Sequence, residues 1–90
     1  MTRKKLFVII NSERDIDYSF CSFLLEKDPD SYAVIRDQID LNILELLIPM
    51  NSPIIEIRRI QENYGESHQA SYIVKYYEIT FEEQKKEVFN

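Results

Sequence analysis

Three carboxylates follow closely on the first apolar run of the chain, and they are its best candidates for metal chemistry. Glu13, Asp15 and Asp17 come soon after residues 6–10, a run that begins at Leu6 and ends at Ile10. Carboxylates at the C-terminal end of a strand can hold a hard cation such as Mg²⁺. The competing interpretation is that they cap and solvate the first turn of a helix. No partner carboxylates from other strands are evident, so we expect neither a metal nor another cofactor.

A single histidine and a single cysteine limit nucleophilic and acid–base catalysis. Any imidazole acid or base would have to be His68, which lies in a polar segment typical of an exposed turn. Cys21 lies beside an apolar helical face, so we expect a half-buried, inert thiol. The pair cannot supply the three or four ligands that zinc needs. The only glycine, Gly65, excludes phosphate-binding loops and nucleophile elbows, which need at least two. We predict that the protein is not an enzyme.

Aromatic residues in the last predicted strand give the strongest indication of function. Tyr72, Val74 and Tyr76 lie on one face of an extended chain, and the opposite face is also half apolar. Only one face can pack on helices, so the other is expected to present aromatic groups to a partner, where tyrosine is enriched. Alternatively, the tyrosines complete the rim of a small core. The residues expected to contact the partner are Arg58, Tyr64, Tyr72, Val74 and Tyr76.

The charge balance favours a protein partner over nucleic acid. Sixteen acidic and 11 basic residues give a net charge of −5. Nucleic-acid binders usually carry a basic stripe, which would here require Arg58, Arg59 and Lys75 to share a face. The acidity instead suits a partner with a basic surface. The lone cysteine indicates a reducing compartment, and residues 6–10 are too short for a secretory signal or a bilayer span. We expect a cytoplasmic protein without membrane contact.

The spacing of apolar residues predicts three strands and two or three helices. Residues 4–10 form a strand that is buried on both faces. Ser12 is a suitable N-cap for the helix that follows, and Pro29 ends it. The apolar face of this helix is formed by Ile16, Phe20, Phe23 and Leu24. The remaining elements are one or two helices over 31–48, strands over 54–61 and 71–81 joined by a turn, and a charged C-terminal tail or short helix over 82–90.

This order, β-α-α-β-β, predicts one α+β domain over residues 1–90. Its natural architecture is a three-stranded, mainly antiparallel sheet with two or three helices on one face. If the last two strands are adjacent, residues 6–10 form an edge, and an exposed apolar edge promotes aggregation. Either the first strand inserts between the other two, or its edge pairs with a second copy or a partner.

We therefore predict a small non-catalytic protein-binding module, such as an inhibitor, an immunity or anti-defence protein, or an accessory subunit. One alternative is a metal-dependent nuclease or phosphotransfer domain that uses the acidic loop at Glu13, Asp15 and Asp17. Another is a structural homodimer built through the edge from Leu6 to Ile10.

Overall fold

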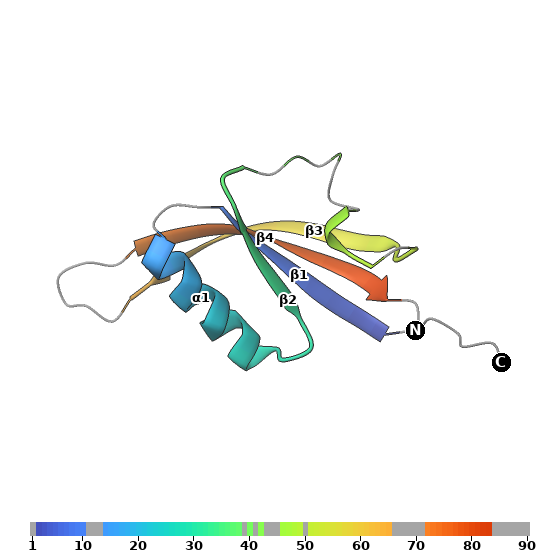
Figure 1. Cartoon of the computed structure of the whole chain (residues 1–90), viewed down its shortest axis with the longest axis horizontal. Helices are drawn as coiled ribbons and strands as arrows, with labels where there is room; N and C mark the ends of the chain where they lie inside the picture. The colour runs from blue at the N-terminus through green and yellow to red at the C-terminus, as the bar shows by residue number, and fades with distance from the viewer. Residues whose placement is uncertain are drawn as a thin grey trace.

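In the described part of the chain, the fold is a four-stranded mixed sheet with one helix packed on it (Figure 1). The computed structural model describes residues 2–10, 14–38, 40, 42, 46–49, 51–65 and 72–83. The sheet order is β2-β1-β4-β3, where β1 pairs with β2 in parallel and with β4 antiparallel, and β3 and β4 form a hairpin. The elements are β1 (Thr2–Ile10), α1 (Arg14–Lys27), β2 (Tyr32–Arg36), β3 (Ile54–Tyr64) and β4 (Tyr72–Glu83).

The predicted three-stranded antiparallel sheet with two or three helices is wrong, and the error lies in residues 31–48. The start of this segment is not a helix but strand β2, which lies parallel to β1 with Leu6 opposite Tyr32 and Ile10 opposite Arg36. A short apolar run fits a helix or a strand equally well by spacing alone. Ala33, Val34 and Ile35 become a strand because β1 offers them a partner, and both faces of that strand are then packed.

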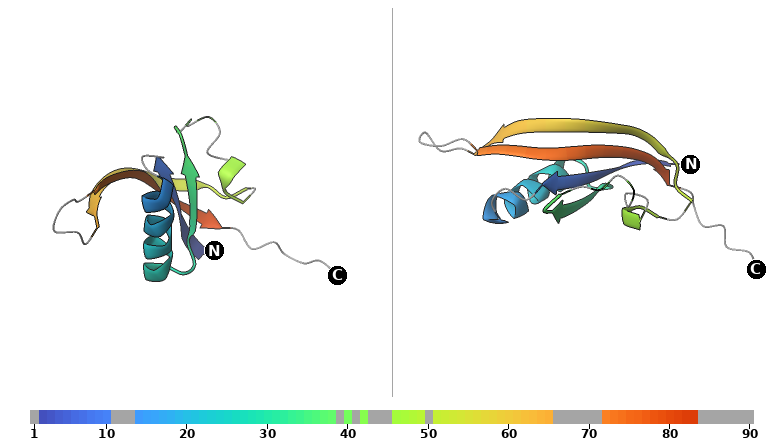
Figure 2. Two further views of the ribbon diagram at one scale, coloured as in Figure 1. Left: turned by 60° about the vertical axis from the view of Figure 1, so that its left-hand side comes forward. Right: turned by 90° about the horizontal axis from the view of Figure 1, so that it is seen from above.

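The rest of that segment places two apolar side chains against the sheet. We call these two residues, Leu47 and Ile48, the plug. A 3₁₀ turn at Leu46 and Leu47 lies on the side of β2 opposite to α1 (Figure 2, left). Leu47 and Ile48 pack against the sheet, whereas Leu46 is exposed. Residues 39, 41 and 43–45 of the segment predicted to form one or two helices lie outside the described residues.

Strand β1 is the centre of the sheet rather than an edge. Residues 6–10 pair with β2 on one side, and most of β1 pairs with β4 on the other. The last two strands do stay adjacent as a hairpin, so β1 is protected by β2 and not by insertion into that hairpin. A homodimer through the edge from Leu6 to Ile10 would require displacement of β2.

The alternating side chains of β1 and β4 divide the core into two clusters, one on each face of the sheet. The cluster under α1 is formed by Phe7, Ile9, Phe20, Leu24, Val74 and Tyr76. The cluster on the opposite face is formed by Leu6, Val8, Ile79 and Phe81, and the plug packs on it. The apolar helix face predicted from the spacing is confirmed, because Phe20 and Leu24 are buried and Ile16 and Phe23 pack beside them.

The N-terminal ends of β1 and β2 are tied to the end of β4 by a polar cluster. The Tyr32 hydroxyl donates to Glu83 over 3.0 Å, and Lys4 Nζ lies 3.4 Å from the same carboxylate. Desolvation lowers the pKa of Lys4, but the hydrogen bond and charge of Glu83, together with Tyr32, outweigh it and leave the pKa raised. Glu82 and Glu83 thus end strand β4, and the remainder of the tail predicted over 82–90 lies outside the described residues.

Phe20 is the side chain on which the packing of α1 depends. It is fully buried, and the centroid of its ring lies 5.2 Å from the ring centroids of both Tyr64 and Tyr76. We expect Phe20→Ala to lower the free energy of unfolding by about 3–5 kcal/mol in urea denaturation. Tyr18 is 62% exposed on the same helix, so Tyr18→Ala should change it by no more than about 0.5 kcal/mol. Equal losses for the two variants would contradict this packing.

Candidate binding surface

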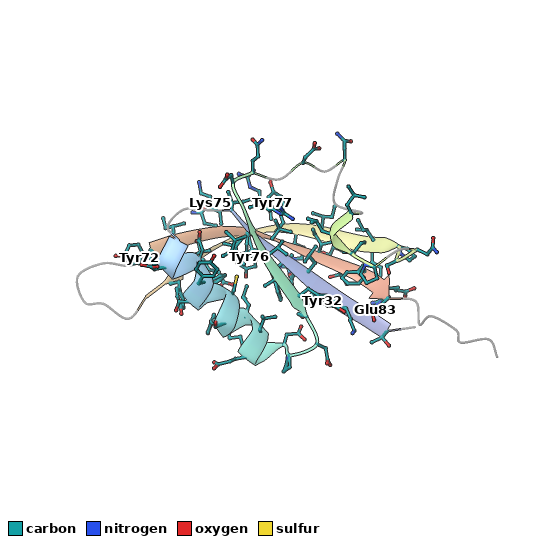
Figure 3. All side chains as sticks on the ribbon, in the orientation of Figure 1. Tyr32, Tyr72, Lys75, Tyr76, Tyr77 and Glu83 are labelled. Atoms are coloured by element: carbon teal, nitrogen blue, oxygen red, sulfur yellow. The ribbon has the colours of Figure 1, made fainter. Side chains whose placement is uncertain are left out.

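Among the described residues, α1 covers one face of the hairpin β3–β4, and the other face is covered by the plug only at the end that holds Ile54 and Phe81. We call the second surface the open face. Figure 3 shows Lys75 and Tyr77 on one side of β4 and Tyr76 on the other, toward α1. Cross-strand pairing places Arg59 beside Tyr77 and Gln61 beside Lys75. The open face consists of Ile57, Arg59, Gln61, Asn63, Ile73, Lys75 and Tyr77.

The open face exposes two large aliphatic side chains next to two cations. Ile57 is 43% exposed and Ile73 is 50% exposed. Single exposed aliphatic residues are normal on a protein surface. Here they flank Arg59 and Lys75 on adjacent strands, which gives a surface that combines apolar area with directional charge. Such a combination is typical of binding surfaces, where apolar anchors supply affinity and charges supply specificity.

A shallow pocket of about 380 Å³ adjoins the open face at the C-terminal ends of β1 and β2. Its lining residues are Ile10, Asp37, Gln38, Arg59, Lys75, Tyr76 and Tyr77. In open sheets, ligands commonly bind outside the carboxyl ends of parallel strands. The lining carries two cations against one carboxylate, so this region is locally basic although the chain as a whole is acidic. The pocket can receive an anionic group.

Two of the predicted contact residues form part of the core. Val74 and Tyr76 are buried under α1, and the Tyr76 hydroxyl donates to Glu62 Oε1 over 2.9 Å. Burial, followed by the hydrogen bond to Glu62, raises the pKa of Tyr76 well above its usual range, so this phenol stays protonated. These two side chains hold the hairpin to the helix.

The other three predicted contact residues lie outside the open face as well. Tyr64 is half-buried against α1, with its hydroxyl 2.9 Å from Ser19 Oγ, whereas Tyr72 is 41% exposed. Arg58 is exposed and donates to Glu78 over 3.4 Å. The pairing of Tyr64 with Tyr72, and of Arg58 with Glu78, places all of these side chains on the face that α1 partly covers.

The basic residues considered at the sequence level do not form one patch. Arg58 and Arg59 are consecutive in a strand and therefore point to opposite faces. Glu78, a buried carboxylate, holds Arg58 and also lies 2.7 Å from Lys5 Nζ. Only Arg59 and Lys75 share the open face.

The structure separates the residues considered for metal chemistry. Asp17 is fully buried and Asp15 is exposed, so the two carboxylates do not face one site, and Glu13 lies outside the described residues. Within the described ranges, no three His, Cys, Asp or Glu side chains are grouped so as to hold a metal ion. His68 also lies outside those ranges.

The open-face residues were visible in the sequence, but nothing in the sequence showed which face of the hairpin is covered. Both faces of residues 72–81 are half apolar, so the alternation alone is symmetric. The face with more tyrosine turns out to pack on α1, because Phe20 and Phe23 provide aromatic partners for Tyr64 and Tyr76.

Comparison with known proteins gives no further guide to function: no family model, no curated protein and no solved structure matches the chain. Among the described helices, none has the length and apolar character required to cross a bilayer.

The position of Tyr76 leads to a stability prediction. We expect Tyr76→Phe to lower the free energy of unfolding by about 0.5–1.5 kcal/mol, because Glu62 loses a hydrogen-bond donor. Tyr72→Phe on the exposed end of the same strand should change it by no more than about 0.5 kcal/mol. Urea denaturation of the two variants measures the difference, and a neutral Tyr76→Phe would show that this hydrogen bond contributes nothing to stability.

Cys21 leads to a prediction about reactivity. Burial, and then the charge of Asp17, raises the pKa of its thiol. Because only the thiolate reacts with a disulfide reagent, labelling at pH 8 should be about tenfold slower or more in the folded protein than in urea. The folded-state rate should also keep rising with pH after an unfolded cysteine has reached its plateau. Identical rates in the folded and unfolded chain would contradict the assigned environment.

Proposed function

We propose that this protein is a small non-catalytic module that binds another protein through the open face of its β3–β4 hairpin. The observation that carries this proposal is the exposure of Ile57 and Ile73 on the same face as Arg59 and Lys75. The sheet is already stabilised by α1 on its other face and by the plug at one end, so the folded chain does not need to cover this area itself.

The local charge defines which partner surface fits. Arg59 and Lys75 flank the pocket, so the contacting part of the partner carries an acidic group that can enter beside Tyr77. The overall charge of −5 still favours a partner whose surface is basic outside this contact. We propose a partner that presents an acidic group within an apolar patch.

A binding module of this size acts by covering a surface of its partner. This mode suits an inhibitor, an immunity or anti-defence protein, or an accessory subunit, and it requires no cofactor. A single cysteine with a suppressed reactivity suits the reducing cytoplasm, which is where we propose that the protein acts.

The decisive experiment compares the captured proteins for two matched surface variants. Three tagged baits are compared in lysate of the source organism: the unaltered chain, Ile73→Asp on the open face, and Tyr18→Asp on the exposed side of α1. Quantitative mass spectrometry measures the proteins that each bait recovers. Burying the unpaired carboxylate of Ile73→Asp in an apolar contact costs more than about 1.4 kcal/mol, so this variant should reduce recovery of the specific partner at least about tenfold. Tyr18→Asp should recover it normally.

Three outcomes contradict the proposal. The first is loss of the partner with Tyr18→Asp but not with Ile73→Asp. The second is that no protein is enriched over the untagged control, and the third is that the enrichment disappears after nuclease treatment. The last outcome would mean that the two cations of the open face contact nucleic acid. Circular dichroism of both variants confirms that each is folded before the comparison.

A further inference from the structure

Strand β3 is a long sheet edge with a partner on one side only. In the described part of the chain it pairs with β4 alone, and it stands last in the sheet order. The opposite edge, β2, is much shorter. An edge strand presents a row of unpaired backbone N–H and C=O groups to which another strand can be added.

A β-bulge, one of the devices that protect such an edge, is confined to the beginning of β3. The register with β4 shifts between Ile54 and Glu56, which places a bulge at Ile55. From Glu56 to Tyr64 the pairing continues without interruption. Residues 56–64 therefore form a regular edge, suitable for antiparallel addition of a second strand.

A second copy of this same edge fits it in one register in particular. In an antiparallel pair, directly opposite side chains lie on the same face of the sheet. If a two-fold axis relates the two strands, one residue must therefore lie directly opposite its own copy, with the axis midway between the two. Ile60 is the midpoint of residues 56–64, and a register centred there pairs the complete edge. It places Arg58 opposite Glu62 of the second copy, and by symmetry this pair occurs twice.

Registers shifted toward the start of β3 are disfavoured by charge, and a centre at Gln61, which opposes no like charges, pairs only residues 58–64 of the edge. A centre at Arg59 places that residue opposite its own copy and also sets Glu56 against Glu62. A centre at Arg58 again opposes two guanidinium groups. Like charges directly across a sheet are destabilising, whereas opposite charges are favourable. The longest register is thus also one that brings opposite charges together and opposes no like charges.

The charged residues keep hydrogen-bonding capacity for this contact. Arg58 is 59% exposed in its side chain; its Nη1 donates to Glu78 and its Nε lies 4.0 Å from Glu56, which leaves other guanidinium donors available. Glu62 accepts the Tyr76 hydroxyl through Oε1, which leaves Oε2 available. Neither residue has to give up its contact within the chain.

We propose that two copies of this chain associate through antiparallel pairing of their β3 edges, centred at Ile60. The two sheets become one continuous sheet. Because the two-fold axis is perpendicular to the sheet, both open faces lie on the same side of the dimer. This inference rests on the edge and its charges and does not depend on the proposed function.

A site-directed disulfide tests the register. At the proposed centre the two Ile60 Cα atoms lie about 4.5–5.5 Å apart, within the range that a disulfide spans. In a Cys21→Ser background, Ile60→Cys should form a covalent dimer in mild oxidant. The matched control Gln61→Cys places its two Cα atoms about 8 Å apart, beyond the reach of a disulfide, and should cross-link at least about tenfold more slowly.

Solution mass and charge reversal test the association independently. Light scattering of the unaltered chain should show a mass that rises from 10.8 kDa toward twice that value with concentration. Glu62→Arg sets guanidinium groups against each other and should weaken dimerisation at least about tenfold, and adding Arg58→Glu should restore it. Thermal melts confirm that each variant is folded.

The proposal is overturned if the chain stays monomeric up to about 1 mM, which is the weak end of measurable association, and Ile60→Cys cross-links no faster than Gln61→Cys. A dimer that cross-links through Gln61→Cys instead would also overturn it. Neither result affects the comparison of Ile73→Asp with Tyr18→Asp, so this inference and the proposed function can fail separately.

Discussion

The pairing of β1 on both of its edges is the constraint on which the rest of the structure depends. Residues 6–9 are buried, and alternate side chains of this strand enter the two opposite clusters of the core. A strand with both faces apolar and both edges polar has to find two strand neighbours and two covers. Strand β2 and β4 supply the neighbours, and α1 and the plug supply the covers. Among the described residues, β3 is left as the longer of the two sheet edges, and the hairpin that it forms with β4 exposes the open face.

Sequence patterns were sufficient where a residue's environment depends on its own neighbours in the chain. The face of α1 that carries Phe20 and Leu24 follows from helical spacing, and the adjacency of β3 and β4 follows from the turn chemistry around Gly65, whose φ of 128° suits glycine. They failed at Ala33–Ile35, because the choice between helix and strand there is made by β1, which is distant in sequence.

The candidate surface was hidden by the same kind of ambiguity. The tyrosines of the last strand were interpreted as contacts because tyrosine is common at interfaces, yet Tyr76 packs on Phe20 and bonds Glu62. Its neighbours Lys75 and Tyr77 face the other way. Composition drew attention to the last strand, whereas the position of α1 decides which side of it meets solvent, and that position is a property of the complete fold.

The uninterrupted register of β3 after the bulge at Ile55 makes an insertion or deletion in this strand more disruptive than a substitution on the open face. Because side chains alternate along β3, loss or gain of one residue after the bulge would turn the strand over, sending Arg59 toward α1 and Ile60 to solvent. Substitution at an exposed open-face position such as Ile73 removes no side chain from either core cluster. Insertions and deletions in residues 56–64 are thus expected to be purged by selection, while the composition of the open face remains free to diverge by point mutation. A lineage of such chains would keep its length in this strand and vary in the surface that the strand exposes.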